Sequence, residues 1–335
     1  MFDNGAILTN IWNSFANVVA PESQLYWLFL LSATGIASLI YWLRRDRNED
    51  VSLRGFLVSC FPRKIYRHPS ALLDFRYFAV NTVVYGAFIG PLLLTSSSTA
   101  LGTAFLLIDL VGEPTSPLLP GGLWADIAVT VVVVVFADIA FFLSHYLQHR
   151  VGFLWEFHKV HHAAEVLHPL ALYRRHPVDA ALDAVLMGGA AGLALGLSGF
   201  IFDESVTGVT ILGTNAVLFV FHFAGVHLRH SHVGLSFGSF DRILISPSMH
   251  QIHHGCSPQH VDKNFGGIFS IWDWLAGTLY LSRDTEELIL GLHNGEHREY
   301  NSITSLYMLP FAKIALRAQR FVSRRFFRKQ ESPST

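Results

Sequence analysis

The stretch "VTVVVVVFADIAFFLSHYLQHRVGFLWEFHKVHH" (129–162) leads from a long apolar run directly into five histidines. Its first part is apolar enough to begin a helix that crosses a lipid bilayer, which needs about 20 such residues. Its second part contains HYLQH and HKVHH, in which histidines recur three and four positions apart. Residues at these spacings share one face of a helix. The stretch therefore predicts a membrane-spanning helix that ends in a cluster of imidazoles.

The composition of the whole chain is typical of a membrane protein. Of its 335 residues, 51 % are hydrophobic and only 15 % are charged, whereas soluble domains carry about 25 % charged residues. The net charge of −1 gives no bias toward nucleic acid, so we expect no nucleic-acid partner. Cys60 and Cys256 form no paired motif, which argues against a disulfide framework and a cysteine-based zinc site.

Apolar segments predict about five membrane spans. They lie near residues 25–43, 77–94, 123–143, 184–202 and 206–228. The run "ALGTAFLLIDLVG" (100–112) is shorter, and we expect it to be re-entrant or to form a hairpin with the second span. The small residues of "LMGGAAGLALGLSGF" (186–200) predict close packing of a neighbouring helix.

The charged loops predict the orientation of these spans. The basic segments 44–54 and 63–67 follow the first span, and positive charge favours the cytoplasmic side. Five crossings then place both histidine-rich regions on the cytoplasmic face. We expect an all-α integral membrane bundle with a cytoplasmic helical cap that carries the histidines, formed by a single catalytic domain over 1–335. The basic tail 311–335 is expected to be amphipathic and to lie along an anionic leaflet.

Histidine is the unusual residue of this chain, because 14 of its 18 copies fall between positions 145 and 254. Three short segments supply eight imidazoles: His145 and His149; His158, His161 and His162; His250, His253 and His254. Eight ligands exceed what one ion with open positions for substrate can use, so the pattern predicts two metals. Neutral imidazole suits zinc, copper, iron and nickel.

The sequence around the histidines favours iron among these metals. The H-E-x-x-H motif of zinc proteases is absent. Soluble di-iron proteins use glutamates together with histidines, and those carboxylates are missing from the three segments. We therefore favour an oxygen-activating di-iron centre at a membrane surface over the other metals.

The order HxxxH, HxxHH, HxxHH and its neighbouring residues resemble the fatty acid hydroxylase/sterol desaturase superfamily, whose members are membrane-bound di-iron oxygenases. The resemblance lies in residues 138–177 and 230–278, within a core of 120–282. It implies that the eight histidines ligate the metals and that His230 is a further ligand. In "HSHV", His232 occupies a position where the family often has asparagine.

Several other polar residues are candidates for supporting roles. His227 lies one turn before His230, and it is either a further ligand or the polar end of the fifth span. His176 is expected beside the ligands or facing the substrate. Asp138, two turns before His145, is expected to orient a ligand histidine. His168, His222 and His260 are expected to be bystanders. Asp273 is expected to fix a turn.

The resemblance implies an O2-dependent hydroxylation of a C–H bond in a membrane lipid, which is a fatty acyl chain, sterol, carotenoid or polar-lipid group. The expected cofactors are two iron ions, with O2 as co-substrate and no catalytic side chain beyond the metal ligands. The sequence contains no haem, flavin, nicotinamide or iron–sulfur motif, so electrons must come from a separate cytochrome, ferredoxin or reductase.

Other functions stay open at this point. Desaturation by the same site is the first alternative, because spacing alone does not separate the two outcomes. A histidine-lined metal transporter predicts ligands near the bilayer midplane, and a haem cytochrome needs single histidines at mid-span, where only His222 lies. Since the histidine segments gather at span ends on one side, we favour the oxygenase.

Overall fold

The computed structural model describes residues 4–44, 52–90, 95–202, 206–282 and 288–330, and it is mostly helical. The α-helices are α1 (Asn4–Val18), α2 (Trp27–Arg44), α3 (Leu53–Cys60), α4 (Arg63–Tyr66), α5 (Pro69–Val84), α6 (Ser96–Val111), α7 (Leu123–Arg150), α8 (Gly152–His162), α9 (Pro177–Ile201), α10 (Ala216–Phe223), α11 (Pro247–His253), α12 (Ile271–Ala276) and α13 (Ile303–Gln330). Short elements connect them: the π-helix η1 (Tyr85–Ile89), the 3-10 helices η3 (Pro169–Tyr173), η4 (Val226–His230), η5 (Gly238–Arg242) and η6 (His293–Glu299), and the antiparallel strands β1 (Thr210–Ile211) and β2 (Thr214–Asn215).

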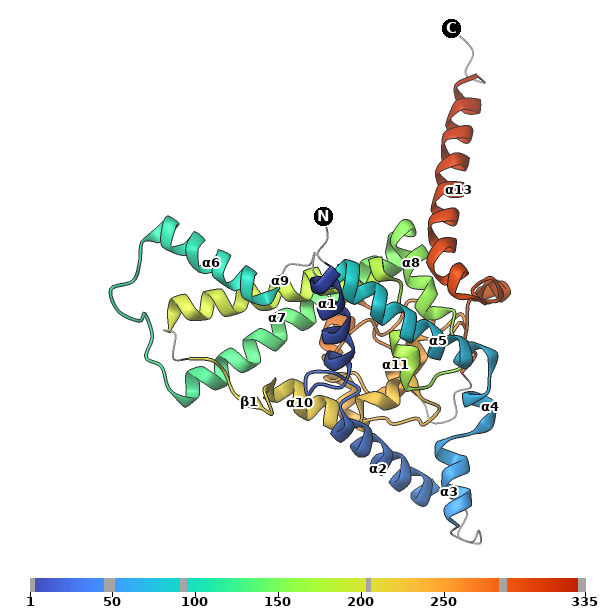
Figure 1. Ribbon diagram of the computed structural model, residues 1–335, viewed down its shortest axis with the longest axis horizontal. Helices are drawn as coiled ribbons and strands as arrows, with labels where there is room; N and C mark the ends of the chain where they lie inside the picture. The colour runs from blue at the N-terminus through green and yellow to red at the C-terminus, as the bar shows by residue number, and fades with distance from the viewer. Residues whose placement is uncertain (1–3, 45–51, 91–94, 203–205, 283–287, 331–335) are drawn as a thin grey trace.

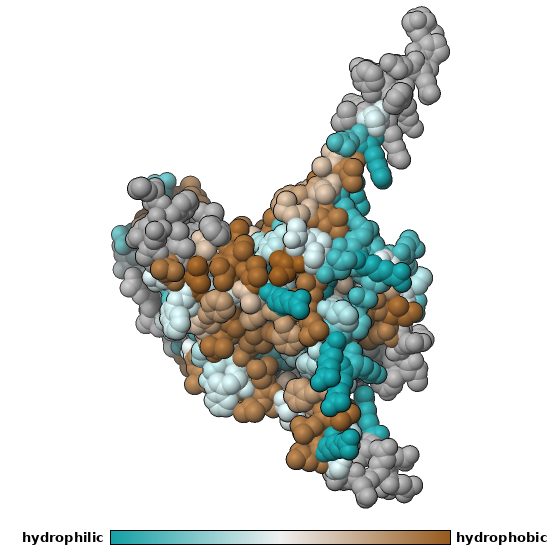
Figure 2. All heavy atoms as spheres, turned by 45° about the vertical axis from the view of Figure 1, so that its right-hand side comes forward, coloured by the Kyte–Doolittle hydropathy of each residue, from teal (hydrophilic) through white to brown (hydrophobic). Residues whose placement is uncertain are grey.

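Among the described residues, three helices are long and apolar enough to cross a bilayer, namely α2, α7 and α9. They correspond to the first, third and fourth expected spans. Only 17 % of the most apolar window of α2 and of α9 is buried, and 39 % of that of α7. Most of each of these windows is apolar surface that is not buried, which is typical of helices that face lipid. Figure 2 shows a broad apolar face bordered on one side by hydrophilic side chains.

The expected fifth span is wrong. Residues 206–228 form the β1–β2 hairpin, the eight-residue helix α10 and the 3-10 helix η4. Gly213 and Gly225 adopt left-handed conformations there, with φ of 83° and 93°, and they interrupt the helix. Eight residues rise only about 12 Å, which is too short for a bilayer core of about 30 Å. Apolar composition predicted this span, but composition alone does not require a continuous helix.

The expected second span also differs from one continuous helix. Residues 77–84 lie in α5, which begins at Pro69 and continues into the π-helix η1. The end of this span, residues 91–94, lies outside the described residues. Asp74 of α5 is buried against Arg174 and His168, so α5 contributes to the part of the protein that surrounds the histidines.

The short apolar run 100–112 forms α6, which packs along α9 and not along the second expected span. Figure 1 shows α6, α7 and α9 side by side in its left-hand part. Two glycines of α9 make the approach of α6 possible. A Cβ at Gly192 would lie 2.5 Å from the Ser96 carbonyl oxygen, and one at Gly196 would lie 2.6 Å from that of Ala100. The close packing predicted from small residues is therefore confirmed.

Helix α13 packs against α8 and α5 near its beginning and then projects from the molecule toward the C-terminus (Figure 1). A hydrophobic core that includes Tyr77, Val160 and Leu306 joins these three helices. Lys159 of α8 pairs with Glu156 of the same helix and with Glu296 of η6, which precedes α13. The packing holds α8, with its three histidines, in a fixed position. The location of the α13 tail on a membrane stays a prediction.

Candidate metal centre

The structure gathers nine histidines into two compact groups. In each group the ligand nitrogens all lie within 4.8 Å of one another. The first group contains His145, His149, His158, His162 and His253, and the second contains His161, His230, His250 and His254. These nine are the eight histidines of the three segments together with His230, so all of the expected ligand residues converge.

Helices α8 and α11 each contribute to both groups. From α8, His158 and His162 belong to the first group, while His161 between them belongs to the second. The segment at α11 has the reverse arrangement. His250 and His254 belong to the second group, and His253 between them belongs to the first. On a helix, the side chain at position i+4 points about 40° away from that at position i, and the side chain at position i+3 points about 60° away on the opposite side. One HxxHH segment can therefore face two neighbouring sites.

The spacing between the imidazole nitrogens fits metal ions. The Nε2 atoms of His145 and His158 lie 3.1 Å apart, and those of His230 and His250 lie 3.2 Å apart. Two nitrogens bound about 2.1 Å from one ion lie about 3.0–3.4 Å from each other. The buried Nε2 atoms of His149 and His253 have no hydrogen-bond partner among the described residues. Nitrogen lone pairs thus converge at both groups as a metal ion requires.

Burial lowers the pKa of six imidazoles outside the spans and so favours their neutral form: His161, His162, His230, His250, His253 and His254. It lowers the pKa of His253 and of His230 to about 3, with a further lowering by the positive charge of Arg229 in the case of His230. Burial and neighbouring histidines hold the pKa of His161 and His162 well below the usual value. Neutral imidazole is the form that binds metal, so these side chains are ready to bind at neutral pH.

Four histidines of the first group have partners at Nδ1, which leaves Nε2 for a metal. Nδ1 of His158 lies 3.1 Å from Asp179 Oδ1, and Nδ1 of His149 lies 3.3 Å from Asp262 Oδ1. The other two contacts are to backbone carbonyls: His145 to Phe265 at 2.9 Å and His253 to Lys263 at 2.7 Å. Metal-binding histidines usually have such partners. Sequence analysis did not identify Asp179 or Asp262, although Asp179 stands out as an acid in the first turn of an apolar helix.

The expected role of Asp138 is corrected by its hydrogen bonds. Its buried carboxylate accepts the backbone N–H of Ile268 at 2.7 Å and of Phe269 at 3.0 Å, and the indole N–H of Trp272 at 2.8 Å. It bonds to no histidine among the described residues. Asp138 instead anchors the loop whose Phe265 carbonyl contacts His145. Asp273 supports the same loop, as expected of a turn residue, by accepting the N–H groups of residues 265 and 266.

His176 and His227 both lie outside the two groups. His176 caps α9, because its Nδ1 accepts the N–H of Val178 at 3.1 Å, and its Nε2 donates to the Tyr307 carbonyl at 3.2 Å. Its expected place beside the ligands is taken by Asp179, three residues further on. His227 is not a ligand in this arrangement, although His230 is close in sequence. The expected bystanders are also outside the groups: His168 pairs with Asp74, His222 packs on Phe29, and His260 packs on Tyr280.

A cavity of about 320 Å³ opens onto the first group and reaches the second. Four histidines line it: His149, His162, His253 and His254. The indole of Trp155 lies on its wall, with its ring centroid 4.8 Å from that of His149. Lys159, Asp262 and Glu296 also line it, so charged side chains border this cavity.

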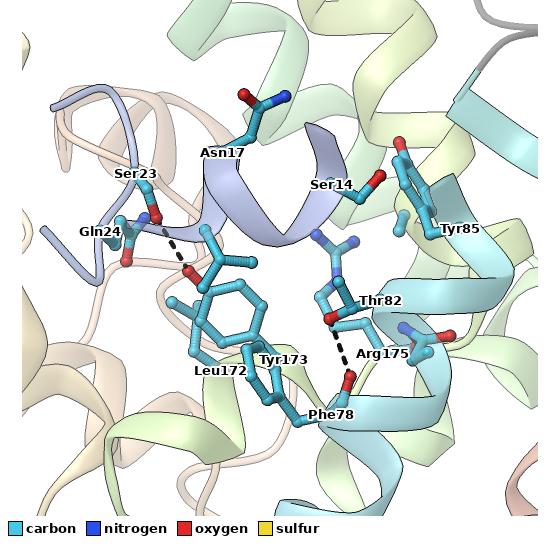
Figure 3. A pocket seen from close by; sticks show the side chains of 13 residues that line it. Ser14, Asn17, Ser23, Gln24, Phe78, Thr82, Tyr85, Leu172, Tyr173 and Arg175 are labelled. Carbon is cyan, nitrogen blue, oxygen red and sulfur yellow. Dashed lines mark hydrogen bonds between the residues drawn. The ribbon is translucent and has the colours of Figure 1, made fainter. Parts of the chain in front are cut away.

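A second cavity, of about 440 Å³ and mostly apolar, lies between α1, α5 and η3 (Figure 3). Arg175 is on its wall and donates to Asp179 at 2.9 and 3.0 Å and to Asp183 at 2.6 Å. Asp179 in turn contacts His158. One ion pair therefore separates this cavity from the first histidine group.

Residues 130–278 match the family model described as fatty acid hydroxylase. The match contains all nine histidines of the two groups. This part of the chain, which carries the candidate metal centre, is similar to the fatty acid hydroxylase family.

Three relatives of the chain illustrate the similarity. The chain is 27 % identical over 175 residues to alkylglycerol monooxygenase of Caenorhabditis elegans, and this alignment covers 52 % of the chain and 30 % of the relative. It is 28 % identical over 190 residues to an ornithine lipid hydroxylase of Rhizobium tropici, covering 55 % and 52 %. It is 29 % identical over 147 residues to human cholesterol 25-hydroxylase, covering 42 % and 47 %. The chain thus spans about a third to a half of the length of these relatives, and no solved structure matches it.

Proposed function

We propose that the chain is an O2-dependent di-iron hydroxylase that acts on a C–H bond of a membrane lipid. The observation that carries this proposal is the convergence of nine buried histidines into two adjacent groups beside apolar helices. Three of the relatives are named as a monooxygenase or hydroxylase of three different lipids. The substrate is correspondingly a fatty acyl chain, a sterol, a carotenoid or a polar-lipid group.

The proposed ligands are the nine histidines of the two groups. Five and four imidazoles leave one or two positions free on a six-coordinate ion, as substrate oxidation requires. Two bound irons would supply the activation of O2 for insertion of oxygen into a C–H bond. No carboxylate belongs to either group among the described residues, which distinguishes the donor set from that of soluble di-iron proteins.

The protein residues hold and orient the ligands in this proposal. Asp179 and Asp262 accept from Nδ1 of their histidines, which directs Nε2 toward the metal. The carbonyls of Lys263 and Phe265 do the same for the other pair. The surrounding burial favours neutral imidazole at most of these positions and limits the entry of water. The chain supplies position and electrostatics, while the bound metal supplies the redox chemistry.

Electrons are proposed to come from a separate cytochrome, ferredoxin or reductase. The cavity beside Trp155, which charged side chains border, offers such a donor an approach to the first group. The positive loop charges support a cytoplasmic location for this face. We propose an integral membrane protein with a single catalytic domain over 1–335, whose core is 120–282 and whose basic tail is 311–335.

Comparative lipid mass spectrometry tests the proposal. The chain, its His254→Ala variant and a His222→Ala control are expressed in the same host, and iron content is measured on each purified protein. We expect a lipid 16 mass units heavier with the intact chain and the control, and its absence together with reduced iron in His254→Ala. A lipid two mass units lighter would assign desaturation instead. Absence of both a product and bound iron in the intact chain would favour a histidine-lined transporter.

A further inference from the structure

His227 is a buried histidine that the metal groups do not use. Its side chain is on the 3-10 helix η4, and the residue is only 4 % exposed. Its Nε2 atom has no hydrogen-bond partner among the described residues. Leaving a buried polar atom unpaired costs about 1–3 kcal/mol, and such atoms in folded proteins need an explanation. The simplest explanation is a ligand group that hydrogen-bonds to it.

His227 lines a mostly apolar cavity of about 250 Å³. One wall is the candidate span α2, which contributes Leu30 and Ala33. Leu228 and Tyr66 are on the other walls. The volume is below the 300–1,000 Å³ of typical ligand pockets, so it accommodates the polar end of a lipid while the rest of an alkyl chain stays along α2.

The same 3-10 helix connects this cavity to the second histidine group. Side chains three residues apart on a 3-10 helix are eclipsed, and they lie about 6 Å apart along its axis. His227 and His230 have this relation on η4, and His230 belongs to the second group. A lipid group held by His227 is therefore held at a defined short distance from a proposed metal ligand.

The other two cavities near the histidines are less suited to an alkyl chain. Lys159, Asp262 and Glu296 line the cavity beside Trp155, and contact with these charged groups disfavours hydrocarbon. The ion pair of Arg175 with Asp179 separates the cavity of Figure 3 from the first group. The cavity of His227 borders a candidate membrane span, and none of the described residues that line it is an acidic residue, a lysine or an arginine.

We propose that the cavity beside α2 binds the lipid substrate and that His227 Nε2 forms a hydrogen bond with an uncharged polar group of that lipid, such as a hydroxyl. The inference rests on the proposed function in one respect, namely that the bound lipid is the substrate. The binding of a lipid in this cavity does not depend on that function. His227 is then a positioning residue. It places the carbons next to the polar group, and not the distant end of the alkyl chain, nearest to the second histidine group.

A binding cycle tests this assignment without enzyme turnover. The purified full chain binds radiolabelled 1-hexadecanol, and unlabelled 1-hexadecanol or hexadecane competes for the site. A neutral hydrogen bond predicts that the alcohol binds about 2- to 10-fold tighter than the alkane. We expect His227→Leu to lose this preference, His227→Gln to retain part of it, and the matched control His222→Leu to retain all of it. Iron content is expected to stay unchanged in every variant.

Three results would overturn the assignment: an undiminished preference in folded His227→Leu, no competition by the alcohol in the intact chain, or loss of iron in His227→Leu. The last result would return His227 to the metal ligands. If His227→Leu does not fold, the assignment depends on His227→Gln, whose preference must fall below that of the intact chain. A positive binding cycle without any lipid product in cells would retain the site and refute the proposed oxidation.

Discussion

Replacement of Asp179 by asparagine tests whether a carboxylate beside a histidine controls metal binding. Asp179 is 2 % exposed, its Oδ1 lies 3.1 Å from His158 Nδ1, and both of its oxygens accept from Arg175. Asp179→Asn preserves the shape but removes the charge that strengthens these hydrogen bonds. Loss of such a partner costs about 10- to 100-fold in metal affinity or activity, which corresponds to about 1.4–2.8 kcal/mol.

The structure also limits the accompanying loss of stability. Removing one member of a buried ion pair costs about 3–5 kcal/mol when the remaining charge has no other partner. Arg175 keeps Asp183, at 2.6 Å, and so we expect a loss of about 3 kcal/mol or less. Thermal unfolding in detergent measures this loss, and chelator competition measures the affinity for iron. The two readouts separate a change at the site from general destabilisation.

Asp262→Asn is the matched comparison. Asp262 also contacts a histidine of the first group, but the distance is 3.3 Å and its side chain is 31 % exposed. Solvent screens such a contact, so we expect a loss of less than about tenfold in iron affinity. The reasoning is refuted if Asp179→Asn binds iron as tightly as the intact chain, or if Asp262→Asn is the more damaging variant.

Three further substitutions test the surrounding structure. Gly192→Leu should lower the stability by about 1–3 kcal/mol because it separates α6 from α9, whereas Gly189→Leu, whose added Cβ meets nothing within 4 Å, should leave the thermal midpoint nearly unchanged. Gly267→Ala places a Cβ 2.5 Å from Asp138 Oδ1, so we expect about a tenfold loss of iron affinity with unchanged helical circular dichroism. Unaltered iron affinity would show that the loop anchored by Asp138 does not support the metal centre. Lys159→Met removes a cation shared by Glu156 and Glu296, but Glu156 keeps Arg317 and Glu296 keeps Lys313. We therefore expect a loss of stability of less than about 3 kcal/mol, and a thermal midpoint equal to that of the intact chain would contradict this expectation.

Local spacing predicted the ligand histidines but not their division into groups. The positions of His158, His161 and His162 on one helix follow from i, i+3 and i+4 spacing. Which of them share a metal site depends on how the consecutive helices α7 and α8 meet η4 and α11, which lie more than 60 residues further along the sequence. The same limit explains Asp138 and Asp179. Spacing along one helix predicts contacts between residues up to about two turns apart, such as Asp138 and His145. Asp179 of α9 contacts His158 of α8, and spacing within one helix does not predict a contact between two helices.

Apolar composition predicted the spans unevenly for a related physical reason. Both a spanning helix and a buried, interrupted segment exclude water, so both are apolar. The segment 206–228 contains glycines whose positive φ values turn the chain, and only the three-dimensional structure shows that these turns are used. In α9 the glycines instead remain helical and receive α6. Glycine in an apolar segment thus has two opposite consequences, and the neighbouring helix decides between them.

The reversed arrangement of the two HxxHH segments has a consequence for how the centre is built. Each segment supplies two histidines to one group and one to the other, so neither group is complete without both segments. His230 of η4 completes the second group, and the two histidines of α7 complete the first. A shift of α8 relative to α11 would therefore change the ligand geometry of both groups together. This explains why α8 is fixed so firmly, by the ion pairs of Lys159 and by the hydrophobic core around Val160, at the positions between its ligand histidines.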